Sequence, residues 1–177
     1  MERLSIKTAA AFVAFAGVLA ACAPSSQHGA YPDVKASTAG AASCPAASAA
    51  ENAAAVRATN ATRSARDLAP LTPDPRLARV AAAHACDMAR RGLMSHKGSS
   101  TRGPMPRAKA AGYAPTIVAE NIAAGPYNQP QVLAQWAASS GHIANIMIPQ
   151  LRDFGIGKAV GSDGKTVYWS AVYAAPR

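Results

Sequence analysis

The segment between Asp74 and Gly92 carries the signals of one well-bounded α-helix. Asp74 is a favoured N-cap residue, and Pro75 suits the first helical position because its missing N–H would have no intrahelical partner there. Gly92 is a residue type that commonly follows the end of a helix. Between these ends the apolar residues recur at the spacing of one helical face, which we expect to face a core: Leu77, Val80, Ala81 and Met88.

Two further residues of this helix carry groups that could do chemistry. His84 falls on the same apolar face, where a hydrogen-bonded structural histidine is favoured over a ligand. Cys86 lies roughly half a turn around the cylinder from that face. We therefore expect Cys86 at the protein surface.

The rest of the sequence predicts short helices and strands in one domain. With 177 residues, about half of them apolar, the chain can bury one core. Extended structure is expected around residues 116–118, and a C-terminal hairpin from strands 154–160 and 166–173 joined by a turn at 161–164. Further helices are expected over residues 46–68, 105–111, 131–139 and 142–147.

Residues 1–21 have the layout of a secretory signal sequence: a charged start, an apolar run over 9–18 and then small residues. The run is too short for a comfortable membrane span. Its end, Leu19-Ala20-Ala21-Cys22, resembles the lipobox of bacterial lipoproteins, so Cys22 is predicted to be lipid-modified and to attach the protein to a membrane. The alternative is an ordinary signal with a chance cysteine. In a cell with two membranes, Ala23 instead of an aspartate favours the outer membrane.

Residues 22–45 are rich in Ser, Ala, Gly and Pro, a composition that cannot bury enough apolar surface to order itself. They are predicted to form a disordered tether, in which the lone His28 has no role as a ligand. The folded domain is therefore expected to cover residues 46–177.

The chain has a formal charge of +9, and removal of Arg3, Lys7 and Glu2 with the signal sequence would leave +8. Such an excess favours anionic surfaces, here lipid head groups or cell-envelope polymers. Nucleic acid is not expected as a partner, because the protein is expected to be exported and aromatic residues do not alternate with its bases. We expect most of the arginines to lie on solvated helix faces: Arg57, Arg63, Arg66, Arg76, Arg79, Arg90, Arg91, Arg102 and Arg107.

Three short polar clusters interrupt the alanine-rich sequence, at residues 95–96, 119–125 and 140–146. They contain one carboxylate, Glu120, and two imidazoles, His96 and His142. If folding brings these side chains together, they could form a cleft for a divalent metal or for the polar head of a ligand. The alternative is a hydrogen-bonded network that only holds loops together.

These clusters, taken with their neighbours, resemble the superfamily of cysteine-rich secretory, antigen 5 and pathogenesis-related 1 (CAP) proteins, in its bacterial lipoprotein form. The resemblance covers about residues 50–177 and implies an α+β fold, a three-layer α-β-α sandwich with a small antiparallel central sheet. The matching stretches stand in family order: residues 84–89, 94–96, 119–123, Trp136, 140–142, 145–146, 155–157 and 168–169.

By this resemblance, His96, Glu120 and His142 match the two histidines and one acid of a cleft that in many relatives takes up a divalent metal. The second acid of those relatives is not evident, because Trp136 is followed by Ala137-Ala138-Ser139-Ser140. We therefore expect any metal, such as zinc, to be held weakly by His96 and His142.

Two function classes follow from the resemblance. Relatives have been linked with sterol and lipid binding, and a few with proteolysis, which leaves a binding module for lipid or envelope polymer and a metal-assisted, peptidase-like hydrolase. The missing acid favours the binding module over an enzyme. A serine hydrolase is not favoured, because Ser140 beside His142 lacks the glycine pattern of a nucleophile elbow.

Cys44 and Cys86 are the only two thiols left once Cys22 carries lipid, and an exported domain folds in an oxidising compartment. We expect a disulfide between them, which would fasten the start of the domain to its second helix. Two unpaired surface cysteines are the alternative.

Overall fold

The computed structural model describes residues 32–177 of the chain. The predicted signal sequence, the predicted lipid attachment at Cys22, the first part of the tether and His28 lie outside this range. Within the described range, no helix has the length and apolar character needed to cross a membrane.

A four-stranded sheet forms the centre of the domain, in the order β2-β5-β6-β4. Strand β6 (Val167–Pro176) pairs antiparallel with both β5 (Asp153–Val160) and β4 (Pro115–Gly125). The short edge strand β2 (Thr72–Pro73) pairs parallel with β5. The expected C-terminal hairpin is therefore present as β5 and β6, and the sheet is antiparallel except at this edge.

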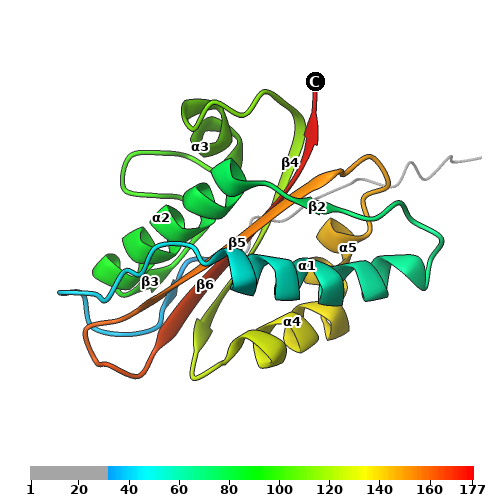
Figure 1. Ribbon diagram of the computed structural model, residues 1–177. Helices are drawn as coiled ribbons and strands as arrows, with labels where there is room; N and C mark the ends of the chain where they lie inside the picture. The colour runs from blue at the N-terminus through cyan, green and yellow to red at the C-terminus, as the bar shows by residue number, and fades with distance from the viewer. Residues whose placement is uncertain (1–31) are drawn as a thin grey trace, which may run out of the picture. The chain divides into compact units, whose positions relative to one another are not determined.

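Helices cover both faces of the sheet (Figure 1). Helices α2 (Pro75–Arg91) and α3 (Pro104–Ala110) pack on one face, against β5, β6 and β4. Helices α1 (Ala49–Ser64), α4 (Gln129–Ala138) and α5 (Ser140–Ile146) pack on one another and on the other face. The predicted α+β class and three-layer α-β-α sandwich are confirmed.

Helix α2 has the predicted bounds and lies directly on β5. The Asp74 carboxylate accepts hydrogen bonds from the N–H groups of Arg76 and Leu77, and Gly92 ends the helix at a φ of 64°. A Cβ added to Gly155 would lie 2.1 Å from the backbone nitrogen of Ala78. The helix can therefore approach this strand backbone to backbone only because the strand has glycine here.

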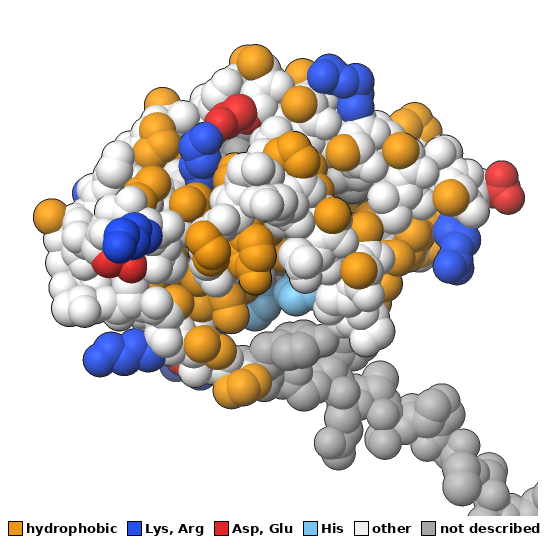
Figure 2. Space-filling model, turned by 90° about the horizontal axis from the view of Figure 1, so that it is seen from below, with side chains coloured by type: hydrophobic (Ala, Val, Ile, Leu, Met, Phe, Trp, Pro, Cys, Tyr) orange, Lys and Arg blue, Asp and Glu red, His pale blue; other side chains and the backbone are white. Residues whose placement is uncertain are grey.

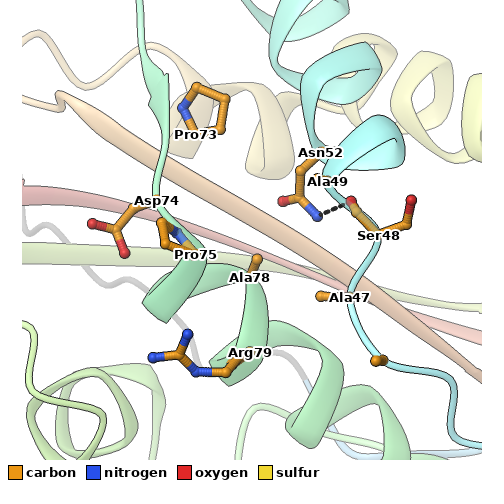
Figure 3. Close-up of a pocket in the computed structure, with 10 residues that line it drawn as sticks. Ala47, Ser48, Ala49, Asn52, Pro73, Asp74, Pro75, Ala78 and Arg79 are labelled. Carbon is orange, nitrogen blue, oxygen red and sulfur yellow. Dashed lines mark hydrogen bonds between the residues drawn. The ribbon is translucent and has the colours of Figure 1, made fainter.

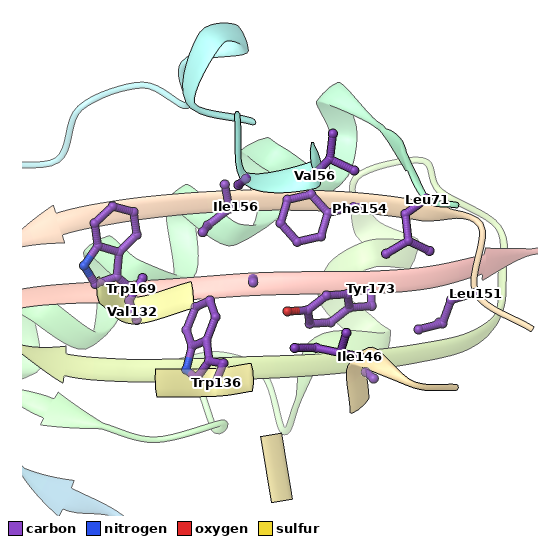
Figure 4. Packing of buried hydrophobic residues seen from close by; sticks show 13 residues of the cluster. Val56, Leu71, Val132, Trp136, Ile146, Leu151, Phe154, Ile156, Trp169 and Tyr173 are labelled. Carbon is purple, nitrogen blue, oxygen red and sulfur yellow. The ribbon is translucent and has the colours of Figure 1, made fainter. Parts of the chain in front are cut away.

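Aromatic side chains fill the opposite face, between the sheet and the helices α1, α4 and α5 (Figure 4). The indole N–H of Trp136 donates to the carbonyl of Ile122, and that of Trp169 donates to the carbonyl of Tyr127. The polar atom of each indole therefore has a partner, which removes the penalty of burying it. The largest side chains of this cluster are Trp136, Trp169, Phe154 and Tyr173.

Helix α1 is shorter than the expected 46–68. It begins after Ser48, whose hydroxyl accepts from the N–H of Glu51 as an N-cap. It ends at Ser64, and the chain then turns away through Asp67, which has a φ of 55°. The helix propensity of the alanine-rich segment predicts that a helix forms there. It does not predict where the helix ends, which depends on the N-cap hydrogen bond and on the turn after Ser64.

The predicted boundary between tether and domain differs from the structure, in which the compact unit begins at Pro32. Strand β1 (Val34–Lys35) pairs with β3 (Leu93–Met94), and the backbones of Ser43 and Val160 form a bridge. We call residues 32–45 the N-terminal arm. The arm forms backbone hydrogen bonds with the rest of the domain. Its amino-acid composition, which predicts disorder, does not take these bonds into account.

The predicted disulfide between Cys44 and Cys86 is confirmed, but the expected surface position of Cys86 is wrong. Cys86 is only 8% exposed. The arm covers this side of α2, since Ala36 and Ala42 pack beside Cys86, and the arm bonds to the carbonyls of Arg90 and Gly92. The face of α2 that carries Cys86 is therefore covered by the N-terminal arm and not by solvent.

Candidate functional site

Glu120 lies in the middle of β4, and its side chain is 1% exposed. Its Oε1 atom lies 2.6 Å from Arg107 Nη2 and accepts from the Ser170 hydroxyl at 3.3 Å. Its Oε2 atom lies 2.8 Å from His96 Nδ1, and His84 Nε2 is 3.6 Å away. Both carboxylate oxygens are therefore engaged by side chains of the same chain.

Arg107 projects from α3 onto this carboxylate and is only 10% exposed. Its Nη1 atom donates to the carbonyl of His96 at 3.0 Å and to the Thr101 hydroxyl at 3.1 Å. One guanidinium thus fixes Glu120 and also the loop that carries His96. The expectation that Arg107 lies on a solvated helix face is wrong, because α3 packs across β4 and turns this side chain inward.

The charge state of Glu120 follows from these neighbours. Burial favours the neutral acid and raises the pKa of Glu120, but the hydrogen bond from His96 and the electrostatic effects of His84, Arg107 and His96 outweigh it. The pKa of Glu120 therefore lies below its usual range, and the side chain is a carboxylate at neutral pH. A carboxylate only accepts hydrogen bonds, so His96 donates from Nδ1.

His142 is placed by β4 as well as by its own helix. The Asn121 side-chain amide donates to the carbonyl of His142 at 3.1 Å. Asn145 donates to the carbonyl of Glu120 at 3.1 Å and to Asn121 Oδ1 at 2.9 Å. These amides join α5 to β4, the strand that carries Glu120.

The imidazole of His142 contacts a residue of its own helical turn. Its Nδ1 atom lies 2.9 Å from the hydroxyl of Ser139, the N-cap residue of α5. Burial and then the proximity of His96 lower the pKa of His142. His142 is therefore a neutral imidazole at neutral pH, and it lies close enough to His96 for a charge on that ring to lower its pKa. Figure 2 shows histidine side chains at the bottom of a hollow in this face.

His84 is the hydrogen-bonded core histidine expected on the apolar face of α2. It is fully buried, and its Nε2 atom donates to the carbonyl of Ser95 at 2.9 Å. Burial lowers the pKa of His84, so the ring is neutral at neutral pH. It lies beneath the site and supports the loop before His96.

A resident zinc ion does not fit the donor set of these residues. The described residues contain no group of three or more histidine, cysteine, aspartate or glutamate side chains able to hold a metal. His96 and His142 supply imidazole nitrogens, but both oxygens of Glu120 already have partners. An open catalytic zinc site has three protein ligands.

A separate pocket of about 430 Å³ lies between the N-terminal turns of α1 and α2 (Figure 3). At its edge the Asn52 amide exchanges two hydrogen bonds with the backbone of Ile156 and thereby joins α1 to β5. His96, Glu120 and His142 do not line it. Its wall is mostly small and apolar, formed by Ala46, Ala47, Ala49, Pro73, Pro75 and Ala78.

Sequence reasoning named His96, Glu120 and His142 and missed the side chains that orient them. Asn121 and Asn145 stand inside the polar clusters, so their positions were a signal that could have been used. Ser139 is three residues before His142, which is the spacing of a helix cap. Arg107 and Ser170 carry no comparable local signal.

Comparison with known proteins agrees with this architecture. The model of the family described as "CAP: Cysteine-rich secretory protein family" matches residues 56–173. The protein YkwD of Bacillus subtilis (strain 168) is 31% identical over 90 residues, which cover 51% of this chain and 35% of that protein. The chain thus spans about a third of the length of this relative.

Two solved structures have similar folds. An extracellular protein of Bacillus anthracis with an SCP domain has a TM-score of 0.63 at 25% identity, over 71% of this chain and 40% of that one. An outer surface protein of Borrelia burgdorferi has a TM-score of 0.64 at 16% identity, over 73% of this chain and 95% of that one. Since the family model spans most of the folded domain, the chain belongs to the cysteine-rich secretory protein (CAP) family.

Proposed function

We propose that this protein is an exported, envelope-anchored CAP protein whose cleft binds a lipid or an envelope polymer. The observation that carries the proposal is the engagement of both Glu120 oxygens by Arg107, Ser170 and His96. With both oxygens engaged, Glu120 itself is not free to act as a general base or as a metal ligand. The cleft therefore suits recognition better than turnover.

Export and attachment to a membrane are part of the proposal. Two similar structures belong to proteins named as extracellular and as outer surface proteins. The Cys44–Cys86 disulfide fits an oxidising compartment. Anchoring through lipid on Cys22, in the outer membrane of a two-membrane cell, rests on the sequence, and the variant Cys22→Ser tests it. If the variant fractionates with membranes as the wild type does, the anchor lies elsewhere.

Binding is tested with purified mature protein, insoluble peptidoglycan and vesicles of extracted envelope lipids. We expect retention of the protein on one of these materials, with no release of products. His96→Ala and His142→Ala should weaken retention, because they remove the polar groups of the cleft. Lys109→Met is the matched control, since Lys109 is an exposed cation of α3 outside the cleft.

A hydrolase is the second candidate, favoured by one observation. A buried carboxylate behind a partly exposed imidazole, as in Glu120 and His96, is the arrangement that orients a general base. Release of soluble peptide or sugar products that is abolished by His96→Ala would replace the binding proposal with this one.

A further inference from the structure

We propose that Arg107 is a positioning residue that makes His96 Nε2 a hydrogen-bond acceptor, and that the cleft consequently takes a hydroxyl group of a glycan in preference to a lipid phosphate. This inference rests on the proposed binding function and narrows its ligand.

The first step is the contact between Arg107 and Glu120. The guanidinium approaches Oε1 to 2.6 Å at a site from which water is excluded, since the Glu120 side chain is 1% exposed. The same guanidinium holds the carbonyl of His96 at 3.0 Å. Arg107 therefore keeps a buried negative charge in place directly behind the imidazole.

The second step concerns the two ring nitrogens of His96. Oε2 of an ionised Glu120 has no proton, so the 2.8 Å contact requires the proton to lie on His96 Nδ1. In the neutral ring, Nε2 then carries a lone pair. The side chain is 35% exposed, and Nε2 has no hydrogen-bond partner among the described residues.

The third step concerns the ligand. A lone pair accepts a hydrogen bond, so the group that meets His96 must bring a hydrogen. A sugar hydroxyl does so, whereas the phosphodiester of a membrane lipid brings only acceptor oxygens. The hydroxyl-rich glycan strands of the envelope therefore match His96 better than the phosphate of a lipid head group.

The tautomer is measured directly by nitrogen-15 NMR of the imidazole at pH 7.5. In the wild type we expect the proton of His96 on Nδ1 and none on Nε2. In Arg107→Met the unpaired Glu120 either takes a proton and donates it to Nδ1 or draws a proton onto the ring, and in both cases Nε2 becomes protonated. Arg107→Lys should restore the wild-type pattern, and Lys109→Met should not change it. A proton on Nε2 in the wild type overturns the inference.

The ligand is tested with a soluble oligomer of β-1,4-linked N-acetylglucosamine and with phosphatidylcholine vesicles, whose head group carries the phosphodiester but no hydroxyl or N–H donor. We expect the wild type to bind the oligomer and His96→Ala or Arg107→Met to lose at least about tenfold in affinity. Arg107→Lys should keep most of the affinity, and Lys109→Met should keep all of it. Vesicle binding that depends on His96, without oligomer binding, overturns the inference but leaves the proposed function standing. Binding to neither probe, nor to peptidoglycan, nor to vesicles of extracted envelope lipids, overturns both.

Discussion

Two arginines with little exposed side-chain surface connect segments on opposite faces of the central sheet, and the groups that they contact differ in kind. Arg107 meets a carboxylate, Glu120, on the α3 side. Arg63, at the end of α1, is fully buried and meets only backbone carbonyls in the described part of the chain. Its guanidinium donates to the carbonyls of Ala69, Ile146 and Ile148 at 2.6–3.0 Å.

The two arginines therefore have different roles: Arg107 acts on a titrating group, whereas Arg63 only links segments of the backbone. Burial and then the charge of Arg152 lower the pKa of Arg63, and the carbonyls around it do not titrate. Arg63 therefore ties the end of α5 and the loop after it to α1 without controlling any proton. Arg107 also ties a loop, but its charge is one of the influences that lower the pKa of Glu120, the carboxylate that contacts His96.

Arg107→Met should have the largest effect on stability, because it leaves a buried carboxylate without its cation. Losing one partner of such a pair costs about 3 to 5 kcal/mol at neutral pH. In the wild type the lowered pKa of Glu120 gives stability that is present above about 4.5 and lost as the pH falls through the folded value. In the variant the folded pKa is raised, so its deficit should shrink as the pH falls. Urea unfolding at several pH values measures this.

The same experiment in a Glu120→Gln background supplies the control. Without the carboxylate, Arg107→Met should cost much less, and the difference between the two backgrounds is the coupling energy of the pair. The coupling energy is compared at neutral pH, because Glu120 raises and Arg107 lowers the pKa of His84, so the titration of His84 differs among the four proteins at lower pH. A cost that is the same in both backgrounds, or that does not change with pH, would show that Arg107 acts only by filling space.

Arg63→Met should cost about 2 to 4 kcal/mol, because it leaves buried carbonyls without donors. The cost should not depend on pH between about 4 and 8, since the lost partners carry no charge. Urea unfolding of this variant beside Arg107→Met measures it. A pH-dependent cost would place a titrating group against Arg63 and would remove the distinction between the two arginines.

Helix α2 was predictable from sequence because its signals are local. Asp74, Pro75 and Gly92 act within one turn of the helix ends, and the apolar face repeats with the helical period. His96, Glu120 and His142 were also found, but through the order of short motifs along the chain. Whether they act together on a ligand remains a prediction.

The two arginines and Cys86 were misjudged because their surroundings come from distant parts of the chain. Arg63 is covered by residues 146–148, and Cys86 by the N-terminal arm. Arg107 finds Glu120 only because α3 crosses β4. Helical spacing predicts which side of a helix a residue is on, but not which later or earlier segment will cover that side.

Zinc binding tests, with a smaller expected effect, whether Glu120 is engaged by Arg107 and therefore not available as a metal ligand. If the ion pair with Arg107 keeps the Glu120 carboxylate from binding a metal, only His96 and His142 remain as ligands. Zinc should then bind weakly in calorimetric titration at neutral pH. Because the pKa of His142 is lowered, protonation of this imidazole should release the zinc only at a pH below the ordinary range of a histidine. His96→Ala and His142→Ala should each abolish the signal, whereas Lys109→Met should not. Tight binding that survives either histidine substitution would place the metal elsewhere.

Ser139→Ala should have the smallest effect, because it changes only how one ring is held. The hydroxyl lies 2.9 Å from His142 Nδ1, and a single partly exposed hydrogen bond is worth about 1 kcal/mol or less. Arg63 and the amides of Asn121 and Asn145 already fix the backbone of α5, so the helix should remain in place while the imidazole turns more freely. Ser140→Ala is the control, since Ser140 is exposed in the same turn. We expect a change in the NMR signals of the His142 ring with Ser139→Ala alone. A loss of stability as large as that of Arg63→Met would mean that Ser139 holds the helix itself, and the division between mechanical and electrostatic anchors would then fail at α5.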